Sequence, residues 1–349
     1  MIRTYSTTIR RKEMDAVLTC MVDEKIGPGE LNSRFIQQVK DFFHCDGAVA
    51  LRSPALALRY ALRALDANTD TPIMISALAP NYQIRTIEDM GLKPIVLDVD
   101  ESNALVSASI VQQGIKDGGR ILVLHEAMGI MPDISSITAL NIPIIEDVSA
   151  SAGATLPAIQ EQSQEGRNAS SFGTFAILGL EEHDVITAGG GAVLMANKRR
   201  DWIALKKFTD SADPTDLLPD LNCALATVEL KEFNKNERTR KEIFSLYHRA
   251  CMASRHKILS REMEHSSTMS AFPLLLSSSY KDARLYAEKK DIEIVRAFEG
   301  SVILSREEEL SQLCKNAKSI SLRCVLFPLY PRLTKTETEK IIKVLGTLP

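Results

Sequence analysis

The first two hundred residues alternate short apolar runs with amphipathic segments, and this alternation constrains the fold more than any other feature. Residues 120–124 and 142–145 are apolar runs of strand length, whereas residues 54–65 place their apolar side chains on one helical face. Such βα repeats are typical of a mostly parallel sheet covered by helices. Because the crossovers between parallel strands are right-handed, we expect the active residues at the carboxyl ends of the strands.

The same patterns predict the order of elements. We expect helices at 54–65, 82–90, 221–247 and 336–345, strands at 72–76, 94–98, 120–124, 142–145, 172–178 and 192–195, and a polar surface loop at 160–171. A chain of 349 residues is long for a single core, which favours two domains. We predict a large α/β domain over residues 15–240 and a small C-terminal α+β domain over residues 241–349, to which residues 1–14 can be added.

Composition excludes several classes of protein. The 42 basic and 45 acidic residues leave a net charge of -3, which argues against nucleic acid as a partner. The six cysteines are widely spaced, without a C-x-x-C pair or a histidine at metal-ligand spacing, so we expect free, mostly buried thiols and no metal site. No apolar run has the length of a membrane span and no signal peptide is visible, so we expect a cytoplasmic protein without a membrane partner.

A long gap in the distribution of lysine marks the middle of the chain. No lysine occurs between Lys116 and Lys198. This stretch contains the acidic pair Glu146-Asp147 at the end of a predicted strand, and a glycine-rich segment at residues 188–192. Any chemistry placed between these two landmarks therefore has to proceed without a lysine from this part of the sequence.

The order of these landmarks resembles the DegT-type nucleotide-sugar aminotransferases, which are fold-type-I pyridoxal-phosphate (PLP) enzymes. The motifs that carry the resemblance are, in chain order, Ile26-Gly27-Pro28-Gly29, the segment from Gly91 to Asp100, His125-Glu126-Ala127-Met128-Gly129, Ile145-Glu146-Asp147, the helix from Ala224 to Leu230, and Phe327-Pro328-Leu329-Tyr330-Pro331-Arg332-Leu333-Thr334. The resemblance implies a PLP-transferase-like α/β fold with a mostly parallel central sheet, flanking helices and a smaller α+β domain. It also implies a nucleotide-sugar ligand and a homodimer whose active site lies between the subunits.

The resemblance assigns roles to individual residues. Asp147 stands where the family holds the pyridinium nitrogen of PLP, Ser53 begins the segment that binds the cofactor phosphate, and His125 matches a histidine of the family. The Schiff-base lysine of the family corresponds to His183 or, in an alternative alignment, to Asp184. Neither side chain can form an internal aldimine, because only a primary amine condenses with the cofactor aldehyde.

The phosphate site of the family is altered as well. Pro54 removes an amide donor from the segment after Ser53, and Ala55 stands where the family has a hydroxyl. A second phosphate hydroxyl corresponds to Gly179 or to Ala176, and neither has one. The losses are therefore linked, and we expect no tightly bound cofactor.

Three hypotheses follow. The first is a degenerate family member that acts as a binding or regulatory protein in sugar metabolism. The second is a sugar 3-dehydratase-like enzyme that uses PLP or its pyridoxamine form (PMP), with His183 as the base, since a histidine near neutral pKa suits proton abstraction. The third is an ordinary sugar aminotransferase with a lysine supplied from elsewhere.

Overall fold

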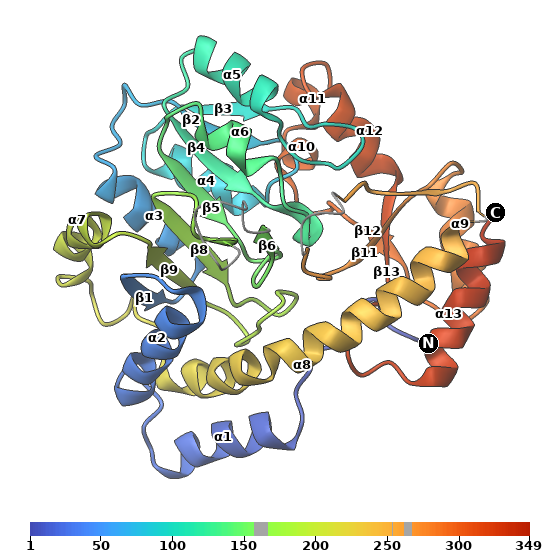
Figure 1. The fold of residues 1–349 in the computed structure, drawn as a ribbon, viewed down its shortest axis with the longest axis horizontal. Helices are drawn as coiled ribbons and strands as arrows, with labels where there is room; N and C mark the ends of the chain where they lie inside the picture. Colours follow the sequence, from blue (N-terminus) through green and yellow to red (C-terminus); the bar gives the residue numbers. More distant parts are fainter. Residues whose placement is uncertain (157–166, 253, 262–266) are drawn as a thin grey trace, which may run out of the picture.

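The computed structural model of the chain describes residues 1–156, 167–252, 254–261 and 267–349 (Figure 1). Among these residues a seven-stranded sheet has the order β1-β9-β8-β5-β4-β2-β3. Strands β3, β2, β4, β5 and β8 are parallel to their neighbours in that series, whereas β9 is antiparallel to both β8 and β1. The strands are β1 (Gly47–Leu51), β2 (Ile73–Ser76), β3 (Pro94–Leu97), β4 (Ile121–His125), β5 (Ile144–Asp147), β8 (Phe175–Gly179) and β9 (Ala192–Ala196). The predicted mostly parallel sheet is confirmed.

A smaller antiparallel sheet follows in the C-terminal part of the chain. It has the order β10-β11-β13-β12 and consists of β10 (Lys257–Ile258), β11 (Phe272–Leu275), β12 (Val295–Arg296) and β13 (Cys324–Phe327). Two further strands, β6 (Thr155–Leu156) and β7 (Arg167–Asn168), pair with each other. Residues 160–166 of the polar loop predicted at 160–171 lie outside the described residues. The next two residues, 167 and 168, form β7.

A helix is present at each of the four predicted segments, with ends that differ by up to four residues. The helices are α1 (Arg11–Val22), α2 (Glu30–Phe43), α3 (Pro54–Ala64), α4 (Asn81–Asp89), α5 (Ala108–Lys116), the 3-10 turn η1 (Ala127–Gly129), α6 (Ile134–Thr138), α7 (Arg199–Thr209), α8 (Asp220–Cys251), α9 (Tyr280–Glu288), α10 (Val302–Ser305), α11 (Glu307–Leu310), α12 (Lys315–Arg323) and α13 (Lys335–Thr347). No helix among the described residues has the length and apolar character that a membrane span requires.

The two faces of the large sheet are covered by different helices. Val49 and Leu51 of β1 pack into one buried cluster together with residues of α3, α4 and α5. Ala48 and Ala50 point into a second cluster with residues of α2 and α8. Successive side chains of a strand point to opposite faces, so the apolar run of β1 is buried on both.

Helix α8 connects the two parts of the molecule without interruption. It contacts α1 and α2 beside the large sheet, and α13 and β10 beside the small sheet (Figure 1). Its 32 residues run from Asp220 to Cys251, past the predicted boundary between residues 240 and 241. The division into domains 15–240 and 241–349 therefore stays a prediction.

The first residue of α8 caps a different helix. Asp220 is buried, and its carboxylate accepts backbone hydrogen bonds from Gly29 and Asn32 at 2.8 Å and from Leu31 at 3.1 Å. These N–H groups belong to the start of α2, whose N-cap, Gly29, has no side chain to satisfy them. One carboxylate thus fixes the start of α2 against α8.

We expect Asp220→Ala to destabilise the protein by about 2–4 kcal/mol, because it leaves buried donors at a helix start without an acceptor. The measurement is the urea midpoint followed by far-UV circular dichroism. Asp15→Ala is the matched control, since the Asp15 side chain is exposed on α1 and forms a surface ion pair with Arg11. Equal midpoints for the two variants would contradict the proposed capping role.

Candidate functional site

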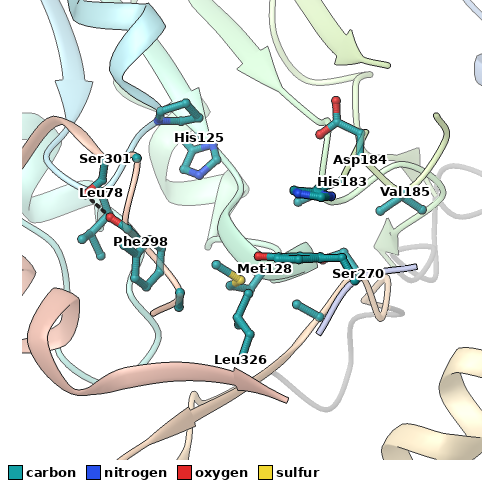
Figure 2. Close-up of a pocket in the computed structure, with 16 residues that line it drawn as sticks. Leu78, His125, Met128, His183, Asp184, Val185, Ser270, Phe298, Ser301 and Leu326 are labelled. Atoms are coloured by element: carbon teal, nitrogen blue, oxygen red, sulfur yellow. Dashed lines mark hydrogen bonds between the residues drawn. The ribbon is translucent and has the colours of Figure 1, made fainter. Parts of the chain in front are cut away.

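The carboxyl ends of the parallel strands surround a cavity of about 290 Å³ (Figure 2). Strand β4 ends at His125, which lines this cavity, and β5 ends next to it at Asp147. The segment that follows β8 contributes His183 and Asp184 to the same wall. The small sheet and its neighbouring loops close the other side with Phe298, Leu326 and several further residues, among them Ser270, Ala271, Ala297, Gly300 and Ser301. The cavity therefore lies where the sequence predicts the active residues, between the two sheets.

Direct backbone contacts hold the two sides of this cavity together. Asn81 donates a hydrogen bond to the carbonyl of Gly300 at 2.9 Å, while Val302 donates to Ala79 at 2.9 Å. These bonds join the loop between β2 and α4 to the start of α10. The two sides are thus joined directly beside Pro80 and Ser301, which line the cavity.

Asp147 is the centre of a hydrogen-bond network within the protein. Its Oδ2 accepts from Gln83 Nε2 at 2.8 Å and from the Tyr82 hydroxyl at 3.1 Å, and it lies 3.4 Å from His125 Nδ1. Its Oδ1 accepts from the Ser149 hydroxyl at 2.6 Å and from the Ser149 backbone N–H at 3.3 Å. Burial alone would raise the pKa of Asp147, but His125 and the donors of Ser149 outweigh it and lower that pKa. Asp147 is therefore a buried carboxylate at neutral pH.

Asp184 has the opposite electrostatic environment. Burial raises the pKa of its carboxyl group to about 8, and the negative charges of Asp147 and Glu181 add to this effect, against one hydrogen bond that the backbone N–H of Glu181 donates at 2.8 Å. At neutral pH the group is mostly protonated. The cavity wall thus has a neutral acid, Asp184, close to a buried anion, Asp147.

His183 lies on the cavity wall but is exposed to solvent. Its ring stacks on that of Tyr5, with 4.0 Å between the ring centroids and 9° between the planes. The N-terminal segment that carries Tyr5 is attached to the C-terminal part of the chain, since Ile2 bridges to Ile292 and Thr4 hydrogen-bonds to Glu293 at 2.8 Å. The stacked pair therefore forms one rim of the cavity.

Ser53 lies elsewhere. Its hydroxyl accepts a hydrogen bond from the backbone N–H of Leu56 at 3.2 Å and so caps α3, which begins at Pro54. It is not one of the residues that line the described cavity. Of the five predicted site residues, the structure brings together His125, Asp147, His183 and Asp184.

The residues around Asp147 test whether a PLP group fits. A carboxylate has about four lone-pair sites, and Asp147 already accepts two hydrogen bonds at Oδ2 and two at Oδ1 from its own chain, with His125 Nδ1 at 3.4 Å from Oδ2. A further donor, such as a pyridinium N–H, has no acceptor site left. The carboxylate that would accept a hydrogen bond from the cofactor ring is therefore already occupied by donors of the protein.

One of the two positions aligned with the second phosphate hydroxyl of the family has no room for a side chain. A side-chain carbon at Gly179, one of the two positions aligned with that hydroxyl, would collide with Asp184 Oδ2 and lie 2.7 Å from Ser149 Oγ. Asp184 thus fills the space that a serine at position 179 would need. No lysine lines the described cavity. The residues present do not fit a lysine-held PLP group.

Sequence reasoning missed several contributors to this site. The sequence patterns singled out none of Tyr82, Gln83, Ser149 and Tyr5. A signal existed for two of them: Tyr82 and Gln83 follow Pro80 in the first turn of a helix after a strand, which directs them to the carboxyl edge of the sheet. Tyr5 carried no such signal, because its contact with His183 depends on the tertiary path of the N-terminal segment.

The six cysteines are free and buried, as predicted. The described residues contain no group of three or more histidine, cysteine, aspartate or glutamate side chains placed to bind a metal ion.

Solved structures of similar fold agree with this architecture. The aminotransferase TlmJ from Streptoalloteichus hindustanus has a TM-score of 0.89 at 15% identity, over 99% of this chain and 98% of that one. The PLP form of the putative sugar aminotransferase Spr1654 from Streptococcus pneumoniae has a TM-score of 0.86 at 16% identity, over 97% and 96%. A variant of GDP-4-keto-6-deoxymannose-3-dehydratase (ColD) with bound GDP-perosamine has a TM-score of 0.85 at 13% identity, over 99% and 100%. These likenesses confirm the predicted PLP-transferase-like fold.

The amino-acid sequence itself matches one family over almost its whole length. The match covers residues 7–212 and 215–346. On this evidence the chain belongs to the DegT/DnrJ/EryC1/StrS aminotransferase family.

Proposed function

We propose that this family member binds a sugar ligand and does not catalyse transamination through a lysine aldimine. The observation that carries the proposal is the saturated carboxylate of Asp147, which accepts from Gln83, Tyr82 and Ser149 and contacts His125. The absence of lysine between Lys116 and Lys198 supports it. A cofactor that forms no covalent bond with the protein, and whose phosphate finds no binding groups, would lack several charge-assisted hydrogen bonds, each worth about 1.5–3 kcal/mol.

The ligand is proposed from the cavity and from the family. An aromatic ring, Phe298, and hydroxyl groups, such as those of Ser270 and Ser301, line the same space, and apolar walls with a few polar groups are typical of small-molecule sites. Relatives in the family and fold are named as sugar aminotransferases and as a dehydratase of a GDP-linked sugar. We therefore propose a nucleotide-sugar ligand, a role as a binding or regulatory protein in sugar metabolism, and a homodimer in the cytoplasm.

A cofactor titration tests this proposal. We expect no visible absorbance band when PLP or PMP is added to the wild-type protein, and no PLP adduct after borohydride reduction and mass spectrometry. His183→Lys and Asp184→Lys return an amine to the two aligned positions, and we expect no aldimine band at the site in either, because the acceptor of the ring nitrogen remains occupied.

Two outcomes would contradict the proposal. One is a band in the wild-type protein that Asp147→Ala removes. The other is a band that either lysine variant gains and that Asp147→Ala removes in that background, since it would mean that only the lysine was lost. The melting temperature of each variant is the control for folding.

A PLP- or PMP-dependent sugar 3-dehydratase with His183 as the base is the second candidate. The observation that favours it is the place of the His183 ring on the cavity wall, exposed to solvent. Its test is the conversion of GDP-4-keto-6-deoxymannose to a 3-deoxy product in the presence of PMP. Conversion by the wild type that His183→Ala abolishes would establish this candidate, and no conversion by the wild type excludes it for this sugar.

A further inference from the structure

We propose that the cavity is a cofactor-independent acid–base site, in which His125, oriented by Asp147, removes a proton from a carbon next to a carbonyl group of the bound sugar and Asp184 protonates the carbonyl oxygen. The inference rests on the proposed function, because it assumes a sugar ligand and no PLP. It adds an activity to that binding site. It assigns the base to His125, which the sequence associated only with cofactor binding.

The first support is the geometry of the His125–Asp147 pair. His125 Nδ1 faces Asp147 Oδ2 at 3.4 Å, and it finds no hydrogen-bond partner among the described residues. A buried carboxylate on this side favours the tautomer with a proton on Nδ1, which leaves Nε2 as the basic nitrogen. The contact is long for a hydrogen bond, as is common for catalytic pairs before a ligand closes the site. The other donors to Asp147 hold the carboxylate in place.

The second support is the position of both groups on one cavity. His125 and Asp184 both line it, on the side formed by the large sheet (Figure 2). Asp184 Oδ2 accepts from the Glu181 N–H, so its other oxygen carries the proton when the group is neutral. The pKa of Asp184 is raised to about 8 while that of Asp147 is lowered. Two carboxyl groups whose pKa values are shifted in opposite directions are suited to different roles, one as a proton donor and one as a permanent anion.

A third support is an unsatisfied polar atom in the cavity. Ser270 Oγ is buried and finds no hydrogen-bond partner among the described residues. Buried hydroxyl groups nearly always have a partner, so an orphan on a cavity wall points to a ligand group or a water molecule. A sugar hydroxyl supplies such a partner.

The proposed reaction balances without an oxidant or a cofactor. The bond between carbon and hydrogen next to the carbonyl breaks, and its proton moves to Nε2 of His125. The electron pair forms the carbon–carbon double bond of an enol, and the carbonyl oxygen takes the proton of Asp184. The reverse steps restore the ketone, so solvent protons exchange into that carbon position.

Deuterium exchange tests the proposal directly. GDP-4-keto-6-deoxymannose is incubated in D2O with the full-length protein, without PLP or PMP, and mass spectrometry follows deuterium at the carbons beside the keto group. We expect the wild-type protein to exchange deuterium faster than buffer alone. Relative to the wild type, the rate should fall at least about 100-fold in His125→Asn and about 10-fold in Asp184→Asn. His44→Asn is the matched control, since His44 is exposed at the end of α2 and far from any proposed role. Added imidazole restores part of the rate in His125→Ala, which a purely structural histidine would not allow.

The outcomes separate the two proposals. No exchange above buffer in the wild type, or full exchange in a folded His125→Asn variant, overturns the acid–base site and leaves the proposed lack of PLP chemistry untouched. Exchange that appears only after PMP is added overturns both. Exchange without cofactor that depends on His125 supports both.

Discussion

Glu146→Ala is expected to destabilise the protein by about 3–5 kcal/mol, because three backbone N–H groups lose the buried carboxylate that accepts their hydrogen bonds. Glu146 is fully buried in β5. Its Oε1 accepts from Phe172 at 2.9 Å and from Gly173 at 2.5 Å, and its Oε2 accepts from Ser170 at 3.2 Å. The segment before β8 therefore wraps around this single carboxylate. Loss of the anchor would disturb β8 and, beyond it, the loop that carries His183 and Asp184.

The measurement is the urea midpoint, with the yield of soluble protein as a first indicator. Glu146→Gln retains one acceptor oxygen, so we expect an intermediate midpoint, and this variant remains informative if Glu146→Ala does not fold. Glu182→Ala changes an exposed glutamate and serves as the control. An unfolding free energy of Glu146→Ala within about 1 kcal/mol of the wild-type value would refute the anchoring role.

The wild-type protein is expected to lose stability as pH rises, and Glu126→Gln is expected to reduce that loss. Glu126 is fully buried beside Glu146, and its carboxyl group also interacts with the Ser151 hydroxyl. Burial, followed by the charge of Glu146, raises the pKa of Glu126 well above its ordinary value. A carboxyl group with a raised pKa in the folded state contributes stability that is complete below its unfolded pKa. That stability decreases as pH rises toward the folded pKa, by about 1.4 kcal/mol per pH unit for one group.

Unfolding free energies measured between pH 5 and 8 test this expectation. Glutamine at position 126 cannot ionise, so its stability relative to the wild type should increase with pH through this window. Asp184, whose pKa is raised to about 8, contributes the same sign and remains in both proteins, which is why the difference between the two proteins is the relevant quantity. A difference that is constant from pH 5 to 8 would mean that Glu126 is ionised in the folded protein.

The strand ends were predictable from the sequence, and the polar network between them was not. His125 and Asp147 follow apolar runs of strand length, so a parallel sheet places them at one edge. Strand β8 begins at Phe175 rather than at the predicted 172, because Phe172 and Gly173 turn toward Glu146 instead of joining the ladder. Helix α8 begins at Asp220 and runs four residues beyond the predicted end at 247. Residue patterns locate elements, but a buried acceptor that reshapes a loop is visible only in three dimensions.

The continuous helix α8 has a mechanical consequence for ligand binding. At 1.5 Å per residue it is about 48 Å long, it shares a buried cluster with strands of the large sheet, and it contacts β10 of the small sheet. The hydrogen bonds from Asn81 to Gly300 and from Val302 to Ala79 fasten the two halves a second time beside the cavity. Hinge closure around a ligand needs a connection that bends, whereas α8 is uninterrupted and these backbone hydrogen bonds would have to break. We therefore expect ligand binding to leave the spacing of the two sheets nearly unchanged and to rearrange side chains at the rim of the cavity, such as the stacked rings of Tyr5 and His183.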